Sequence, residues 1–282
     1  MIITTLIEDT LAAGSPDQLP AGLTAEHGLS LLIESTQARV LFDTGTSGAF
    51  ADNARLLGVD LTRLDAAVIS HHHYDHGGGL ERLFDTNLAV RAWMKPPPDG
   101  EPVAAAPDGS TRPIGINRDL LSEHKHRFVL ATGPVQIAPG VTLLPDISGA
   151  HPLPAGNERL LLASSNGTRP DPFDHELAIV VEEAGEIVVI TGCAHRGILN
   201  IVATSADAFP RHPIRAVVGG FHLNSESDAA VVAVANGLRE RAVRHVVTGH
   251  CTGQNALAIL TAELGDERVT PLATGCRFAF QM

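Results

Sequence analysis

The chain has 282 residues, of which 44% are hydrophobic, 18% are charged and 4% are aromatic. This balance argues against an intrinsically disordered chain or a small disulfide-stapled scaffold, and it predicts a soluble protein with one large core. The 20 Lys and Arg residues stand against 32 Asp and Glu residues, for a formal net charge of −12. Such an acidic surface repels phosphate backbones and anionic lipids, so we expect no nucleic-acid partner and no membrane partner.

Features of targeting, membrane insertion and disulfide bonding are missing from the sequence. No apolar run approaches the roughly 20 residues of a membrane span, and the N-terminal segment has no basic region followed by a small-residue cleavage site. The three cysteines, Cys193, Cys251 and Cys276, are too few for a disulfide framework. We therefore expect reduced thiols, a cytoplasmic location and a small-molecule substrate. A homodimer is compatible with an acidic chain of this size.

Apolar segments rich in β-branched residues predict strands along the whole chain. They cover residues 29–34, 39–42, 66–70, 176–182, 186–191, 215–219 and 245–248. Segments with apolar residues three or four positions apart predict helices. They cover residues 49–57, 79–84, 198–208, 228–241 and 254–264. Because the early strands follow one another through short turns and the late strands alternate with helices, we expect an α/β fold with a mixed sheet or a pair of sheets.

The middle of the chain, residues 95–158, is rich in turn residues, including the runs PPPDG and PDG. We interpret this segment as an insertion of loops and short strands, and as a candidate lid over an active site. No internal repeat or linker divides the chain. We therefore expect a single domain over residues 1–282.

The segment SHHHYDHGGG at residues 70–79 directly follows a predicted strand. Its position inside the chain and before a predicted helix argues against a purification tag. Imidazole nitrogens bind zinc well, and His71 and His73, two residues apart at a strand end, can point to the same side. Asp75 and His76 then face a second position a few ångströms away.

Three further histidines follow predicted strands and glycines. They are His195 in GCAHRG, His222 in GGFHL and His250 in GHCTG. A single histidine at a strand end is more often structural than a ligand, but the repeated layout argues that these side chains converge at one sheet edge. From this layout alone His222 competes with His250 for a ligand role, and we rank His222 second.

These motifs resemble those of the metallo-β-lactamase fold superfamily, whose HxHxDH motif is matched by residues 71–76. The segment LFDTG at residues 41–45 is similar to the strand and turn that usually precede that motif. The segments AEHGLS, GCAHRG, GGFHL and GHCTG look like a narrower subgroup, the dihydropterin-ribofuranosylaminobenzene-phosphate synthase-like proteins. The resemblance covers nearly the whole chain and implies a four-layer αββα sandwich, with a metal site at one edge between the sheets.

The resemblance also implies two adjacent metal positions. The first would use His71, His73 and His195, and the second Asp75, His76 and His250. Cys193 stands where the superfamily usually has a bridging aspartate, so it is either a thiolate ligand or a spectator. If Cys193 takes that aspartate position, His175 is an alternative third histidine for the first ion. Zinc is the first choice of metal, as one or two ions, with manganese or iron as alternatives.

The resemblance predicts a metal-dependent hydrolase that directs a zinc-activated hydroxide at a small ester, lactone, thioester or phosphoester. Asp75 would orient the hydroxide, and His222 would donate a proton to the leaving group or hold the substrate. His27 and Arg196 are further expected substrate contacts. The alternatives are a pyrophosphate-releasing condensation, as in the synthase subgroup, and a metal-binding sensor without turnover. Lysine is rare in the chain, which favours a substrate less charged than a diphosphate.

Overall fold

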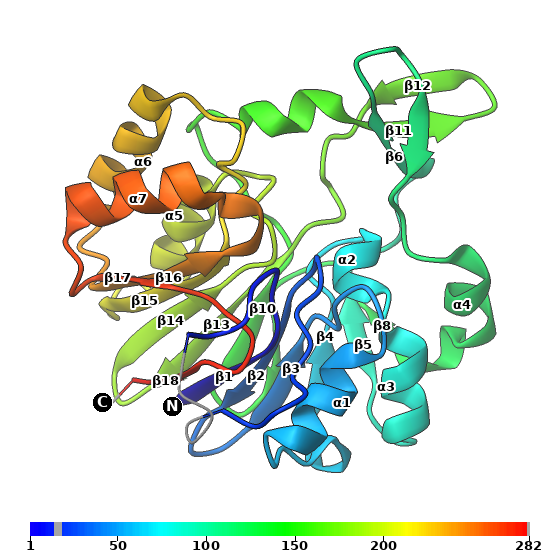
Figure 1. Ribbon diagram of the computed structural model, residues 1–282, viewed down its shortest axis with the longest axis horizontal. Helices are drawn as coiled ribbons and strands as arrows, with labels where there is room; N and C mark the ends of the chain where they lie inside the picture. Colours follow the sequence, from blue (N-terminus) through cyan, green and yellow to red (C-terminus); the bar gives the residue numbers. More distant parts are fainter. Residues whose placement is uncertain (14–18, 281–282) are drawn as a thin grey trace.

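Two seven-stranded sheets pack face to face at the centre of the computed structural model, which describes residues 1–13 and 19–280 (Figure 1). The first sheet contains, in spatial order, β18 (Arg277–Ala279), β1 (Ile2–Ile7), β2 (Ser30–Glu34), β3 (Arg39–Phe42), β4 (Ala66–Val68), β5 (Ala92–Met94) and β8 (Phe128–Leu130). The second contains β17 (Val269–Pro271), β16 (His245–Gly249), β15 (Ile214–Gly220), β14 (Glu186–Ile190), β13 (Ala178–Glu183), β10 (Val141–Leu144) and β9 (Val135–Ala138). A small third sheet contains β12 (Gly167–Pro170), β11 (Leu160–Ser164), β6 (Glu101–Ala105) and β7 (Thr111–Pro113).

Helices flank the pair of large sheets (Figure 1). The first sheet is accompanied by α1 (Ala49–Leu56), α2 (Tyr74–Gly77), α3 (Leu80–Thr86) and α4 (Arg118–Glu123), and the second by α5 (Ile198–Ala208), α6 (Asp228–Glu240) and α7 (Gln254–Leu264). Short 3₁₀ helices lie at η1 (Leu61–Arg63), η2 (Lys125–Arg127), η3 (Ala155–Arg159) and η4 (His250–Thr252). The predicted four-layer αββα fold is confirmed.

Strands in the middle layers are apolar on both faces because both faces are buried. In β14, Val188 and Ile190 lie in the core between the two large sheets, whereas Ile187 and Val189 lie in the core beneath the helices of the second sheet. A third core packs α1 and α3 against the first sheet. Each fully buried aliphatic side chain contributes about 1.5–3 kcal/mol, so the alternation fixes which residues of each strand face each layer.

Parallel pairing brings several strand ends to one edge of the sandwich. β3 pairs in parallel with β4, and β14, β15 and β16 pair in parallel with one another. The segments that leave these strands carry the motifs singled out in the sequence. The two sheet edges meet there, since Nε2 of His76, from the first half of the chain, lies 3.1 Å from Sγ of Cys193, from the second half.

The turn-rich segment 95–158 divides into two parts in the structure. β8 and β9 are edge strands of the two large sheets, β10 lies between β9 and β13, and all three belong to the framework. β6 and β7 instead join β11 and β12, which follow residue 158, in the small sheet. We call this small sheet and its connections the outlying unit. It combines residues from inside and outside the expected insertion. Within the described ranges 1–13 and 19–280, none of the helices combines the length and apolar composition of a membrane span.

Candidate metal centre

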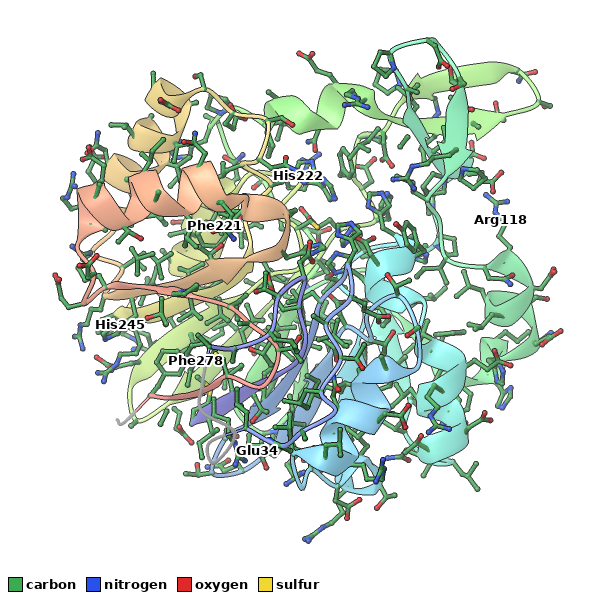
Figure 2. The ribbon with its side chains drawn as sticks, viewed as in Figure 1. Glu34, Arg118, Phe221, His222, His245 and Phe278 are labelled. Carbon is green, nitrogen blue, oxygen red and sulfur yellow. The ribbon has the colours of Figure 1, made fainter. Side chains whose placement is uncertain are left out.

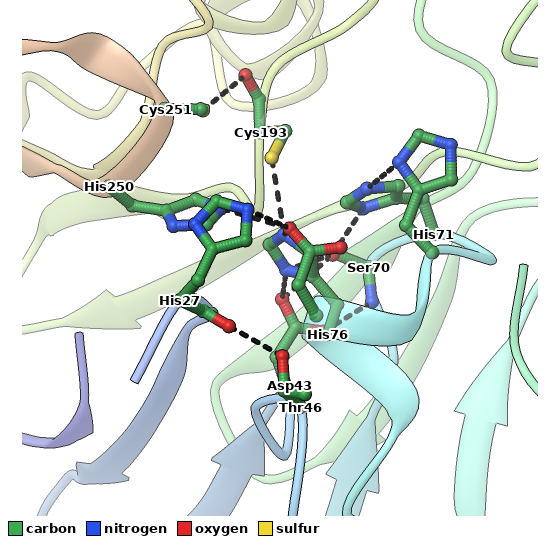
Figure 3. A network of polar contacts seen from close by, with 12 residues as sticks. His27, Asp43, Thr46, Ser70, His71, His76, Cys193, His250 and Cys251 are labelled. Atoms are coloured by element: carbon green, nitrogen blue, oxygen red, sulfur yellow. Dashed lines mark hydrogen bonds and ion pairs between the residues drawn. The ribbon is translucent and has the colours of Figure 1, made fainter. Parts of the chain in front are cut away.

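Side chains from both sheets converge at the shared edge (Figure 3). Four of the residues that turn the chain there have a positive φ: Asp43 (61°), Ala194 (59°), His222 (52°) and His250 (50°). L-amino acids rarely adopt this conformation, and it persists where the surrounding contacts enforce it, most often at functional sites. The local backbone is therefore held for the side chains that it presents.

The first donor set is His71, His73 and His195, whose ring nitrogens lie within 4.8 Å of one another. Nε2 of His71 lies 3.0 Å from Nδ1 of His73. Nδ1 of His71 donates to Ser70 Oγ at 2.9 Å, and Nδ1 of His195 donates to Asn157 Oδ1 at 3.0 Å. These two bonds fix the tautomers, so that Nε2 of His71 and Nε2 of His195 keep a lone pair for an ion.

The second donor set is Asp75, His76, Cys193 and His250, whose ligand atoms also lie within 4.8 Å of one another. Nδ1 of His76 donates to Asp43 Oδ2 at 2.7 Å, and Nδ1 of His250 donates to Asp9 Oδ1 at 2.7 Å. Their Nε2 atoms face Asp75 Oδ2, at 3.6 Å for His76 and 3.4 Å for His250. Carboxylates behind imidazoles are the usual support of metal-binding histidines.

The first donor set is neutral. Burial lowers the pKa of His71 and of His195 well below the usual value, and it lowers the pKa of His73 to about 3. Neutral imidazole is the form that binds a metal. Nε2 of His195 is buried and has no hydrogen-bond partner among the described residues. Buried polar atoms are normally satisfied, so this nitrogen fits a site for a divalent ion.

The second donor set contains an ionised carboxylate. Burial alone would raise the pKa of Asp75, but the imidazoles of His76 and His250 outweigh it and hold that pKa below its usual range. Burial lowers the pKa of His250, yet hydrogen bonds to Asp75 and Asp9 reverse this and raise it well above the usual value. Burial raises the pKa of the Cys193 thiol, so Cys193 would lose its proton on binding an ion.

His175, the alternative third histidine, has both ring nitrogens engaged elsewhere. Its Nε2 lies 3.0 Å from Asp171 Oδ2, and its Nδ1 accepts the backbone N–H of His72 at 3.2 Å. It forms a buried group with Asp171 and His73. The structure therefore places His195, rather than His175, with His71 and His73, and His175 supports the backbone between those two histidines.

His222 lies beside the first donor set, on the α5–α7 side of the molecule, and Arg118 lies on the α4 side (Figure 2). The ring centroids of His222 and His195 are 4.3 Å apart. Nδ1 of His222 is buried without a hydrogen-bond partner in the described part of the chain. A Cβ at Gly156 would lie 2.8 Å from His222 Nε2, so glycine lets η3 lie close to this ring. Proton donation or substrate binding by His222 stays a prediction.

The other two expected substrate contacts lie in different surroundings. Nε2 of His27 lies 3.4 Å from Asp75 Oδ2, and the His27 side chain is 58% exposed, so it lies at the open side of the second donor set. The guanidinium of Arg196 donates to the backbone carbonyls of Pro172 and Ile147. Arg196 thus ties two loops together, and its role toward a substrate stays a prediction.

The groups that accept hydrogen bonds from Nδ1 of the histidines were not predicted from the sequence. Asp9 and Asn157 were not singled out, and Asp43 was noted only as part of the LFDTG segment. Asp43 accepts hydrogen bonds from Ser70 N at 2.7 Å and Ser70 Oγ at 2.8 Å as well as from His76. One signal was available: Asp9 follows the β-branched segment of residues 2–7, and Asp43 follows a predicted strand. A short acidic side chain at a strand end often faces a site.

Two buried glutamates hold the backbone of the ligand loops. Glu176 accepts the backbone N–H groups of His195 at 2.8 Å and Arg196 at 2.7 Å, and burial raises its pKa to about 7. Glu8 accepts the backbone N–H of His250 at 2.7 Å. Both ligand loops are therefore fixed by side chains from neighbouring segments, and neither glutamate was predicted.

The chain is similar to known proteins over most of its length. The profile of the metallo-beta-lactamase superfamily matches residues 23–214. The chain is 27% identical over 277 residues to the 7,8-dihydropterin-6-methyl-4-(beta-D-ribofuranosyl)-aminobenzene-5'-phosphate synthase of Methanocaldococcus jannaschii, covering 94% of this chain and 92% of that protein. An uncharacterised protein of the same organism is 28% identical over 247 residues, covering 84% of this chain and 88% of that protein.

Two solved structures are also similar. Tm1679, described as a metal-dependent hydrolase of the beta-lactamase superfamily, has a TM-score of 0.82 and 32% identity, with 100% of both chains covered. Zn(2+)-bound PqqB from Methylobacterium extorquens has a TM-score of 0.56 and 11% identity, covering 99% of this chain and 100% of that chain, and it shares the fold. Because the family profile matches well over half of the sequence, the chain belongs to the metallo-beta-lactamase superfamily.

Proposed function

We propose that the protein is a metal-dependent hydrolase that acts on a small, weakly charged ester, lactone, thioester or phosphoester. This proposal rests on the two neighbouring donor sets, which are both buried. In each set, hydrogen bonds at Nδ1 hold imidazoles in place, as for His195 and His250. When bound there, a divalent ion such as zinc polarises the scissile group and lowers the pKa of water from about 15.7 towards about 7.

Asp75 and His222 have separate roles in the proposed reaction. The Asp75 carboxylate, held ionised between the imidazoles of His76 and His250, orients the attacking water. His222, whose ring lies against His195, faces the leaving group with a ring nitrogen that no described residue occupies and donates a proton or binds the substrate there. These roles are assigned by position at the site.

The proposed lid is the outlying unit around the small sheet. One of its connections, residues 114–116, pairs with the metal motif: the backbone N–H of Tyr74 donates to Ile114 O at 2.8 Å, and the backbone N–H of Ile116 donates to His72 O at 3.2 Å. On the other side, η3 contributes Asn157 to His195. The unit thus touches the site through two segments, and it is suited to cover a substrate.

The weak charge of the proposed substrate follows from the cations near the site. The Lys95 ammonium donates to Pro145 O at 2.6 Å, and the guanidinium of Arg118 donates to Gly100 O at 2.6 Å. Arg196 is engaged with carbonyls in the same way. Each of these cations already has a backbone partner, so a multiply charged phosphate would depend mainly on the ions themselves.

Metal analysis and hydrolase assays test the proposal. The purified protein is stripped with a chelator, reloaded separately with Zn²⁺, Mn²⁺ or Fe²⁺, and assayed with nitrophenyl esters, a thiolactone and a phosphodiester. We expect hydrolysis that requires metal and is lost in His71→Ala. The control is His126→Ala, which removes an imidazole of η2 that takes no part in either donor set. A reloaded protein that hydrolyses none of these classes would contradict the hydrolase proposal.

The second candidate is a pyrophosphate-releasing condensation. It is favoured by the 27% identity to the dihydropterin synthase, which spans 94% of this chain and 92% of that protein. Release of pyrophosphate from a pterin methyl diphosphate, in the presence of an aromatic amine acceptor, would identify this reaction. Metal-dependent pyrophosphate release without ester hydrolysis would favour the synthase-like activity over the hydrolase.

A further inference from the structure

The carboxylate of Asp9 holds two imidazoles. Its Oδ1 lies 2.7 Å from Nδ1 of His250, and its Oδ2 lies 3.0 Å from Nδ1 of His27. The backbone N–H of Gly28 also donates to Asp9 Oδ1, at 3.2 Å. Because an ionised carboxylate only accepts hydrogen bonds, both Nδ1 atoms carry a hydrogen, and Asp9 holds both rings by that nitrogen.

Both rings turn their other nitrogen towards the same oxygen. Nε2 of His27 and Nε2 of His250 each lie 3.4 Å from Asp75 Oδ2, and Nε2 of His76 lies 3.6 Å from it. Three imidazole nitrogens therefore surround one carboxylate oxygen at similar distances. Neighbouring ligand atoms of a tetrahedral zinc ion lie about 3.3–3.4 Å apart, because each is about 2.0–2.1 Å from the ion. The 3.4 Å distances of His27 and His250 from Asp75 Oδ2 match this separation, and the 3.6 Å distance of His76 exceeds it slightly.

The loop that carries His27 is fixed to the metal motif by its backbone. The N–H of Leu29 donates to Asp75 O at 3.1 Å. A Cβ at Gly28, whose φ is +152°, would lie 2.6 Å from the same oxygen, so only glycine permits this approach. The rings of His27 and His250 lie 4.9 Å apart and are tilted by 32°. His27 therefore covers the second donor set from its open side.

We propose that His27 is an additional ligand of the second metal position, and that Asp9 positions both His27 and His250 for that role. The ligand set implied by the family resemblance does not include His27, for which the sequence pattern predicts a substrate contact instead. The inference rests on the proposed metal-dependent function, because it requires an ion in the second position. Asp9 makes no hydrogen bond or ion pair with the first donor set among the described residues, so the effects of both residues should be confined to the second ion.

Stepwise titration with Co²⁺, in competition with a chelating indicator, tests this assignment. In His27→Ala we expect the affinity of one equivalent to fall at least about tenfold, because even partners behind a ligand change affinity by about 10–100-fold. The other equivalent should change less than twofold. The visible absorption of the weakened equivalent should also change, since it reports the ligands of cobalt directly. His126→Ala serves as the control and should leave both equivalents unchanged.

Two further variants separate a ligand from a support. His27→Gln keeps an N–H that can reach Asp9 but has no imidazole nitrogen, so it should behave like His27→Ala if His27 binds the ion. Asp9→Asn should weaken the same equivalent, because an amide offers one acceptor atom to two rings. An unchanged affinity in both His27 variants, or a reduced affinity with an unchanged cobalt spectrum, would overturn the assignment. A wild-type protein that takes up no ion would instead contradict the proposed function itself.

Discussion

The two donor sets differ in what lies behind their histidines. In the first set, His71 and His195 donate their Nδ1–H to neutral oxygens, Ser70 Oγ and Asn157 Oδ1. In the second set, His76 donates its Nδ1–H to the Asp43 carboxylate (Figure 3). His250 donates its Nδ1–H to the Asp9 carboxylate. A carboxylate partner raises the basicity of an imidazole and holds its ring more firmly than a neutral oxygen does.

The difference extends to the ligands themselves. The first set consists of three imidazoles kept neutral by burial, whereas the second contains the ionised Asp75 and the thiol of Cys193. An ion in the first position is therefore held mainly by three nitrogen bonds. An ion in the second position also depends on charges that surround it, which makes that position more sensitive to residues that do not touch the ion.

The largest effect on metal affinity is expected when one of the three imidazoles of the first set is removed. His195→Ala should weaken one equivalent of metal more than about a hundredfold, beyond the 10–100-fold effect of outer partners. His175→Ala should keep both ions but lose about 3–5 kcal/mol of unfolding free energy, because Asp171 then keeps a buried charge without its partner. Metal analysis and urea denaturation measure the two effects. Loss of metal in His175→Ala, with metal retained in His195→Ala, would reverse the assignment of the third histidine.

In each donor set, the sequence predicts the ligands from residues 71–76 better than the ligands from the second half of the chain. His71, His73, Asp75 and His76 are visible because they lie within six residues, where spacing alone shows that they share a site. His195 and His250 could be linked to them only through the repeated strand, glycine and histidine layout and the family resemblance. Asp9 could not be linked at all, since it lies 241 residues from His250, and no local pattern encodes a contact over that separation.

The secondary structure was likewise predicted only where the local sequence determines it. The helices at residues 198–208 and 254–264 have the predicted bounds, because their apolar periodicity lies between clear stop signals. The first follows Gly197 and ends two residues before Pro210, and the second lies between Gly253 and Gly265. The strands β8, β9 and β10 were hidden inside the segment 95–158. They are three or four residues long and lie at or next to a sheet edge. In such short strands, pairing with a neighbour decides strand formation more than the local sequence does.

A smaller effect is expected from a carboxylate behind the second set. Asp43→Asn should weaken the second equivalent of metal by about 10–100-fold and leave the first within about twofold. The amide keeps the size of the side chain but removes the charge that faces Nδ1 of His76 at 2.7 Å. Chelator competition measures both affinities. If both ions weakened equally, Asp43 would support the whole site through Ser70 rather than the second set through His76.

The smallest effect is expected from the corresponding neutral partner in the first set. Asn157→Ala removes the acceptor of His195 Nδ1, a bond of 3.0 Å between two uncharged groups. Such a bond is worth about 1 kcal/mol net, so the first equivalent of metal should weaken by about fivefold. Chelator competition on Asn157→Ala and Asp43→Asn side by side would measure the contrast directly. If Asn157→Ala cost as much metal affinity as Asp43→Asn, the charge of the group that accepts the Nδ1–H would not distinguish the two positions. The orientation of the imidazole ring alone would then account for both effects.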